Sequence, residues 1–196
     1  MISNLLARFT LWILGWKTEG NKSPHKKYVM IAAPHTTNMD GLLLLAAAGF
    51  FRMKISWMIK HTMLKIPIFG WLLKSTGAVA INRTAKQGLV QQMIQKFAEK
   101  EEFILAIPPA GTRSYRDYWK SGFYVIAKEA GVPIVPGYLN YKTRVAGFGE
   151  SFIPSDVKKD MDYLRKFYKD ITPRYPQKKS RIKLALEDEA EKQESA

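Results

Sequence analysis

The 196-residue sequence contains no cysteine. A disulfide framework, a thiol nucleophile and a thiolate metal site are therefore excluded. Acidic residues are also scarce, because 17 Asp and Glu stand against 31 Lys and Arg, which gives a formal net charge of +14 at pH 7. There is no Gly-x-Ser-x-Gly motif, so the strained turn that presents a serine nucleophile in α/β-hydrolases is not expected. Internal repeats and linkers are absent as well, and a chain of this length suits one domain with a sizeable core.

The excess of positive charge needs a partner, because a net charge this far from zero costs self-repulsion. Nucleic acid is one possible partner, but the basic residues are scattered, and no helix-turn-helix, zinc or RNA-binding signature accompanies them. An anionic membrane surface explains the charge equally well, and it also explains apolar segments that look exposed. We therefore expect a membrane partner and no nucleic-acid partner.

The first 17 residues predict an amphipathic helix. Apolar residues recur at the spacing of one helical face, at Ile2, Leu5, Leu6, Phe9, Ile13 and Trp16. The apolar stretch is shorter than the roughly 20 residues that cross a bilayer. A helix lying in the membrane interface is one interpretation, and a helix packed on the sheet as ordinary core is the other. We favour the first, with residues 1–17 as the interface helix, 18–176 as the main domain and 177–196 as a charged tail that is frayed or disordered.

Apolar stretches that read as buried strands alternate with helical patterns along the rest of the chain. The expected strands lie in residues 28–32, 77–83, 103–114 and 132–136, with a half-exposed one at 54–60. The expected helices lie in residues 42–51, 86–100, 119–130 and 155–169. This alternation predicts an α/β fold, a single domain with a mixed, largely parallel sheet flanked by helices.

His35 and Asp40 lie where the first of these strands hands over to a helix. Ligand sites in open α/β sheets usually occur at such carboxyl ends of strands. Histidine titrates near neutrality and a nearby carboxylate can fix its tautomer, so the two together make a plausible general base. The same spacing also arises by chance, so the pair alone does not establish catalysis.

Arginines follow two of the other strands. Arg83 closes the second strand, and Arg113 follows the third in Gly111-Thr112-Arg113. Because the ends of parallel strands converge on one edge of a sheet, we expect both arginines near His35. Two arginines facing a histidine–aspartate pair suggest an anionic substrate held beside a general base. Either arginine could instead pair with a surface carboxylate.

The ordered set of motifs resembles the glycerolipid acyltransferases of the lysophosphatidic acid acyltransferase type. The His-x4-Asp motif of that family matches His35 and Asp40, and its later motifs match residues 77–83, 109–113 and 132–136. The resemblance covers residues 28–140. It departs from the family pattern at Ala110, where the family normally carries glutamate, and more mildly at Asn82, where an aspartate often precedes the arginine.

The resemblance implies a glycerol-3-phosphate acyltransferase-like fold and an O-acyltransferase activity. Such an enzyme moves a fatty acyl group from acyl-CoA or acyl carrier protein to the free hydroxyl of a lysophospholipid-like acceptor, above all 1-acylglycerol-3-phosphate, in phospholipid biosynthesis or remodelling. Neither a cofactor nor a metal is needed. We expect a monomeric, peripheral membrane protein on the cytoplasmic face of the inner (plasma) membrane of a bacterium.

The resemblance also assigns roles to single residues. His35 would be the general base and Asp40 its partner, while Arg83 and Arg113 would hold the acceptor phosphate. Gly111 and Thr112 would let the backbone approach the substrate closely. We interpret Lys120 as a solvated lysine at the start of a helix.

Two alternatives stay open at this point. A lipid-binding, catalytically degenerate relative would hold a phospholipid without turning it over, and Ala110 is the best argument for it. Residues 61–75, in which Pro67 and Gly70 interrupt an apolar run, either line an acyl groove and touch lipid or form a helix-turn-helix core.

Overall fold

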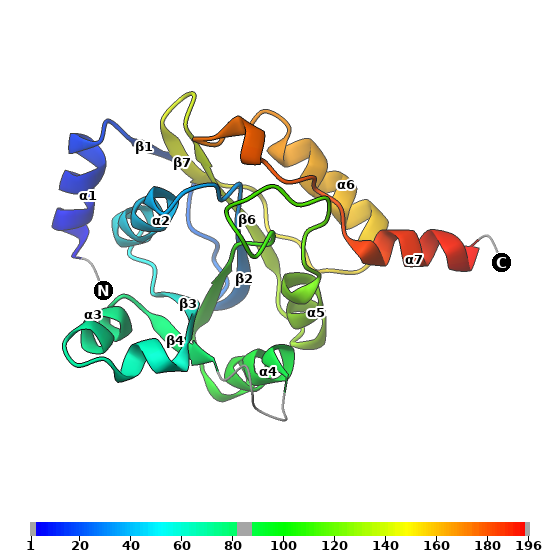
Figure 1. Ribbon diagram of the computed structural model, residues 1–196, viewed down its shortest axis with the longest axis horizontal. Coiled ribbons are helices and arrows are strands. Elements are labelled where there is room, and N and C mark those ends of the chain that lie inside the picture. The colour runs from blue at the N-terminus through cyan, green and yellow to red at the C-terminus, as the bar shows by residue number, and fades with distance from the viewer. Residues whose placement is uncertain (1–2, 82–87, 195–196) are drawn as a thin grey trace.

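The computed structural model describes residues 3–81 and 88–194 and is built on one seven-stranded sheet (Figure 1). Its strands are β1 Lys17–Glu19, β2 Lys27–Ala32, β3 Ile55–Lys60, β4 Ala78–Ile81, β5 Phe103–Ile107, β6 Ile134–Asn140 and β7 Val145–Phe148. The order across the sheet is β1-β7-β6-β2-β5-β3-β4, and neighbours are parallel except for β6 and β7. The mixed, largely parallel sheet predicted from the sequence is therefore confirmed.

Helices cover both faces of this sheet. They are α1 Asn4–Ile13, α2 Met39–Phe50, α3 Phe69–Ser75, α4 Leu89–Glu99, α5 Gly122–Glu129, α6 Val157–Tyr168 and α7 Ala185–Glu194, with short 3₁₀ turns η1 His61–Lys65 and η2 Pro176–Lys178. Helices α4, α5 and α6 pack on one face, while α2 covers the other face and α1 packs outside α2 (Figure 1).

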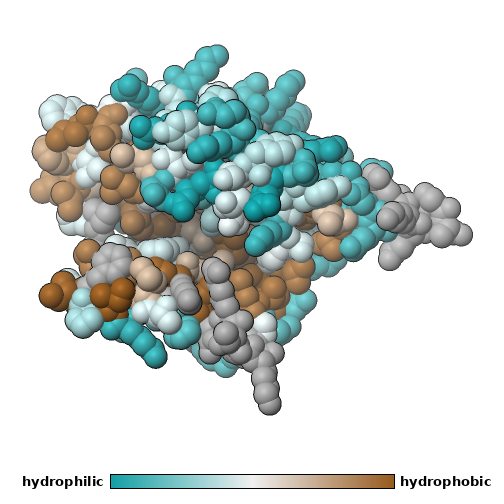
Figure 2. Space-filling view, viewed as in Figure 1, coloured by the Kyte–Doolittle hydropathy of each residue, from teal (hydrophilic) through white to brown (hydrophobic). Residues whose placement is uncertain are grey.

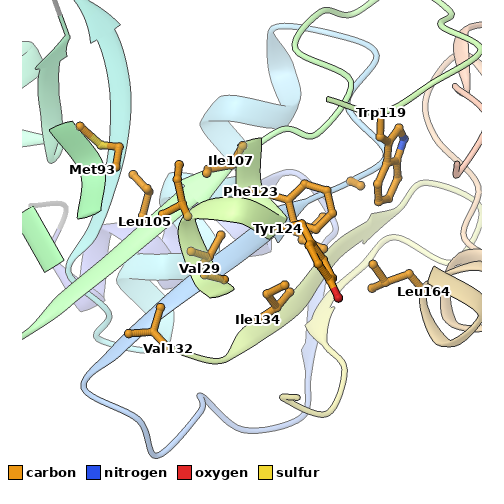
Figure 3. Packing of buried hydrophobic residues seen from close by; sticks show 14 of the residues in the cluster. Val29, Met93, Leu105, Ile107, Trp119, Phe123, Tyr124, Val132, Ile134 and Leu164 are labelled. Atoms are coloured by element: carbon orange, nitrogen blue, oxygen red, sulfur yellow. The ribbon is translucent and has the colours of Figure 1, made fainter. Parts of the chain in front are cut away.

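The central strand β2 explains why the core has two sides. Val29 and Ile31 point to the face covered by α4, α5 and α6, and Figure 3 shows Val29 packed there among other apolar side chains. Tyr28 and Met30 point to the face covered by α2. A strand buried on both faces has no solvent-facing positions, so β2 is apolar along its length rather than alternating. Fully burying an aliphatic side chain of this size stabilises a fold by about 1.5–3 kcal/mol.

Helix α1 packs on α2 through a narrow face. Ala7 and Leu11 are buried there, and the Asn4 side-chain amide donates to the carbonyls of Gly49 (3.1 Å) and Phe50 (2.7 Å) at the end of α2. The exposed face carries Leu5, Leu6, Phe9, Trp12 and Ile13. One face of this helix thus packs on the protein, on α2 and not on the sheet itself, while a membrane contact of the exposed face stays a prediction. Within the described residues, no helix is long and apolar enough to span a bilayer.

The segment after residue 176 differs from the frayed or disordered tail that we expected. Leu184 is fully buried and forms a β-bridge with Trp119. Glu187 accepts a hydrogen bond from the Leu184 amide (2.7 Å) and pairs with Arg165 of α6 (2.7 Å). The sequence did not predict these contacts, because Trp119 and Arg165 lie far away from this segment along the chain.

Candidate functional site

His35 and Asp40 lie together at the carboxyl end of β2. The Nδ1 atom of His35 is 3.2 Å from Oδ2 of Asp40, and the side chains are 24% and 5% exposed. The spacing of the two residues in the sequence therefore corresponds to a contact in space. Because Nδ1 faces the carboxylate, Nε2 of His35 is left to face a substrate, which is the arrangement that a general base needs.

Further donors fix the Asp40 carboxylate. Its Oδ2 atom accepts hydrogen bonds from the amides of Thr36 (2.7 Å) and Thr37 (3.0 Å), and its Oδ1 atom accepts one from the Tyr141 hydroxyl (2.6 Å). Burial raises the pKa of Asp40. Hydrogen bonds from His35, Tyr141 and the two amides together lower it by more than burial raises it, so the pKa lies below its ordinary value. Asp40 is thus an anion at neutral pH. It also lies in the first turn of α2, where the helix dipole favours negative charge.

A cavity of about 730 Å³ begins at this pair. Its wall is mostly apolar and draws on α2, α3, α5 and the central strands, with Leu44, Leu45, Ala48, Met58, Leu73 and Ile126 among the lining side chains. Among the described residues, the charged or titratable side chains in the wall are His35, Asp40, Lys120 and Tyr138. Protein pockets for small ligands usually measure about 300–1,000 Å³ and combine apolar walls with a few polar groups, as this one does.

Exposed apolar side chains flank the cavity. Leu72 and Leu73 of α3 line it, while Ile66, Ile68 and Trp71 next to them face solvent. Figure 2 shows a hollow on this face of the molecule with hydrophobic residues on both sides of it. Helix α3 therefore lines the cavity, and the residues around it present an apolar surface, while contact of residues 61–75 with an acyl chain or with lipid stays a prediction.

The loop after β5 contributes Gly111 and Lys120 to the cavity wall. Gly111 has a φ of +66°, and a Cβ added there would lie 2.9 Å from Cε of Lys120. A glycine is therefore needed at this position for the Lys120 side chain to lie across the loop. Lys120 is exposed and lies just before α5, as expected of a solvated lysine at the start of a helix. The sequence did not indicate that the same side chain also lines the cavity.

The remaining predicted ligands are less closely placed. Arg113 is exposed and Thr112 is half-buried, and the cavity wall includes neither of them. Arg83 lies outside the described residues. Of the three predicted substrate-binding residues that the structure describes, Gly111 alone borders the cavity.

Ala110 is not among the residues that line this cavity. It is 8% exposed, belongs to the core cluster of α5 and α6, and lines a second, much smaller cavity together with His35, Trp119 and Lys178. A carboxylate at this position would point toward Trp119 and Lys178. The fold therefore places Ala110 in the core cluster and beside the smaller cavity, and not in the wall of the larger one.

The chain belongs to the Acyltransferase family, because the model of that family matches residues 16–140. It is 26% identical over 140 residues to the 1-acyl-sn-glycerol-3-phosphate acyltransferase of Pseudomonas aeruginosa. The matched region covers 66% of this chain and 53% of that protein. It is 27% identical over 169 residues to the protein of the same name from Streptococcus pneumoniae, with 76% and 62% covered. The chain thus spans between half and two thirds of the length of these relatives.

A solved structure supports the fold independently. The 1-acyl-sn-glycerophosphate acyltransferase PlsC of Thermotoga maritima superposes with a TM-score of 0.58 at 19% sequence identity, over 84% of this chain and 74% of that one. At this identity the likeness concerns the fold.

Proposed function

We propose that this protein transfers a fatty acyl group from a thioester donor to the free hydroxyl of a lysophospholipid, with 1-acylglycerol-3-phosphate as the favoured acceptor. The observation that carries the proposal is the His35–Asp40 pair at the mouth of an apolar cavity of about 730 Å³. A general base supplies the chemistry of acyl transfer, and the apolar wall suits a fatty chain. The names of the two curated relatives support the same acceptor.

The proposed reaction needs no protein nucleophile. Nε2 of His35 takes the proton of the acceptor hydroxyl as the hydroxyl oxygen attacks the thioester carbonyl. The tetrahedral intermediate then expels the thiolate, which receives the same proton from His35. Asp40 holds the imidazole through Nδ1 and stabilises it while it carries positive charge, as in hydrolase triads. The products are an ester and a free thiol, so the step balances without an oxidant or a metal.

The acceptor phosphate needs a cation near the base. Lys120 lies in the cavity wall and is the described side chain that fits this role. Arg113 precedes Lys120 on the same loop, and we retain Arg113, Arg83 and Thr112 as proposed contacts of the bound substrate. Hydrogen bonds from a charged donor to a phosphate are roughly twice as strong as neutral ones, which is why a cation suits this role.

A membrane surface is the proposed source of the acceptor and the destination of the product. The exposed apolar faces of α1 and α3 suit insertion into the interfacial region of a bilayer, and the net charge of +14 suits anionic headgroups. We propose that these faces hold the protein at the cytoplasmic side of a bacterial inner membrane as a peripheral protein.

A thioester-release assay tests the activity. Purified protein is mixed with acyl-CoA or acyl carrier protein loaded with a fatty acid, and thiol release is followed with a panel of lysolipids. We expect release to depend on the acceptor and to be fastest with 1-acylglycerol-3-phosphate, with the diacyl product detected by mass spectrometry. Binding of lysolipid without thiol release from either donor would favour the alternative, a lipid-binding relative that does not turn its ligand over.

A further inference from the structure

Tyr141 touches the candidate site but lies one residue beyond the part of the chain that the family model matches. It follows β6, the strand next to β2, and stands in the turn that connects β6 to β7. Its hydroxyl donates a hydrogen bond of 2.6 Å to Oδ1 of Asp40. The other carboxylate oxygen, Oδ2, faces His35 and the amides of Thr36 and Thr37.

The two oxygens of Asp40 are therefore held from opposite sides. The Tyr141 hydroxyl is the donor to Oδ1, and the side chain of Asp40 is only 5% exposed. Without that hydroxyl, Oδ1 would be a buried acceptor that has lost its donor. A buried acceptor left without a donor costs about 1–3 kcal/mol, and a carboxylate relieves that cost by rotating. Rotation would carry Oδ2 away from Nδ1 of His35.

The position of Tyr141 is itself fixed by the fold. Its backbone amide donates to the Thr172 carbonyl (2.8 Å). Its ring meets the ring of Trp16 edge to face, with the centroids 4.9 Å apart and an interplanar angle of 87°. The Trp16 amide in turn donates to the Leu11 carbonyl (2.8 Å) at the end of α1. Edge-to-face contacts of this kind contribute about 0.5–1.5 kcal/mol beyond the area that they bury.

We propose that Tyr141 is a positioning residue of the His35–Asp40 pair, and that Trp16 holds its ring, so that the segment following α1 helps to set the geometry of the base. The inference rests on the proposed function for its effect on turnover. It goes beyond that function because it adds a residue outside the four motifs. It also connects the proposed membrane helix to the base through a chain of contacts.

The neighbouring charges agree with a structural role for the hydroxyl rather than a role as an acid. Burial raises the pKa of Tyr141, and the hydrogen bond to the Asp40 anion raises it further, while Arg174 lowers it by less. The phenol therefore keeps its proton throughout the neutral range. Tyr141 then acts as a fixed donor to Asp40 and does not itself exchange a proton with substrate.

The test replaces Tyr141 with Phe, which removes the hydroxyl and keeps the ring that packs on Trp16. With saturating donor and 1-acylglycerol-3-phosphate, we expect kcat to fall roughly tenfold, as expected for one lost hydrogen bond to a charged group, while KM stays within about twofold. Tyr163→Phe is the matched control, because its hydroxyl donates to the Glu150 carbonyl far from the pair. An unchanged kcat in a folded Tyr141→Phe protein would overturn the proposal.

A second variant tests the link through Trp16. Trp16→Ala should lower kcat in the same direction, and Trp16→Phe should restore part of it. In the double variant with Tyr141→Phe the two losses should not add, because both act through the same hydroxyl. Additive losses would show that Trp16 acts by another route and would remove it from the proposal.

A measurement that needs no turnover separates this inference from the proposed function. Carbon-13 NMR of the Asp40 carboxyl group follows its titration in the wild type and in Tyr141→Phe. We expect the pKa of Asp40 to rise in the variant, because a hydrogen bond to its charged form is lost. If the wild type proves inactive but the titration shifts, the contact stands and the function fails. An unchanged titration overturns the inference whatever the activity.

Discussion

At the scale of single residues, Asp40 connects the site to the stability of the fold. Burial raises its pKa, and the hydrogen bonds that it accepts lower it to below the ordinary value. A carboxyl group with a depressed pKa stabilises the folded state fully above its unfolded pKa of about 3.9. That contribution is lost as the pH falls through the folded value.

We therefore expect the free energy of unfolding to decrease below about pH 4 more steeply in the wild type than in Asp40→Asn, which cannot be protonated. Urea denaturation of both proteins at pH 6 and pH 3 measures the difference. The same decrease in both proteins would mean that Asp40 is not held as an anion in the fold.

Ala110 gives a second prediction at this scale. Because its side chain faces the core beside Trp119, Ala110→Glu adds volume and charge where the loop packs against α5 and α6. Overpacking of this kind typically costs about 1–3 kcal/mol. We expect a lower melting temperature and no gain in acyl transfer.

Ala110→Gln is the matched control, since it has the same size without the charge. A smaller loss in the Glu variant than in the Gln variant would indicate that the carboxylate pairs with Lys178. A gain in activity in the Glu variant alone would show that the carboxylate reaches the acceptor, against the orientation seen here.

The contact between His35 and Asp40 could be predicted from the sequence, because a short-range pattern indicates it. His35 and Asp40 are five positions apart and follow an apolar strand, so their contact follows from local geometry. Tyr141 could not be found in this way, because it meets Asp40 only when β6 lies beside β2. The fourth strand was predicted to end at residue 136, whereas β6 runs to Asn140. The longer strand places Tyr141 at the edge of the sheet where His35 and Asp40 lie.

At the scale of secondary-structure elements, the periodicity of apolar residues predicted the central strands and the helices that cover them. The same signal could not separate the two faces of α1, because both are apolar. Burial separates them, since Leu11 packs on α2 whereas Trp12 is 74% exposed. In the C-terminal segment the signal failed for another reason: the apolar stretch around Leu184 is short, and its partner, Trp119, is distant in the sequence.

Leu11 and Trp12 form a matched pair of test positions on α1. Leu11→Ala removes a buried side chain and should lower the free energy of unfolding by about 2–5 kcal/mol. Trp12→Ala removes an exposed one and should change it by less than about 0.5 kcal/mol. Thermal or urea denaturation of the two variants in detergent-free buffer measures both values. Similar losses in both would mean that Trp12 packs on the protein rather than facing solvent.

At the scale of the whole molecule, large apolar side chains are exposed on the helices α1 and α3. Helices α1 and α3 present Trp12 and Trp71, which are 74% and 73% exposed, and α3 also lines the cavity. Exposed apolar patches of this kind mark interaction surfaces. Together with the net charge of +14, they favour an anionic bilayer as the partner.

Vesicle flotation tests that arrangement. We expect the protein to float with vesicles that contain anionic lipid and to be released as salt rises, because charges are screened over about 10 Å at 0.1 M. Trp12→Ala and Trp71→Ala should each weaken binding. Ile153→Ala should not, because Ile153 is exposed beside Phe152, which pairs with the amino-terminal end of β6 away from the site. Equal flotation of all four proteins would rule out the apolar faces as the membrane contact.

The central claim is that His35 acts as the general base of acyl transfer, and one substitution tests it most directly. The His35→Ala and His25→Ala proteins are compared with the wild type in an acyl-transfer assay with a thioester donor and 1-acylglycerol-3-phosphate. His25 is exposed and lies outside the site, so His25→Ala controls for the loss of an imidazole. We expect His35→Ala to lose roughly 10²- to 10⁴-fold in kcat with its fold and lipid binding intact, while His25→Ala keeps full activity. Wild-type turnover in a correctly folded His35→Ala protein would contradict the mechanism.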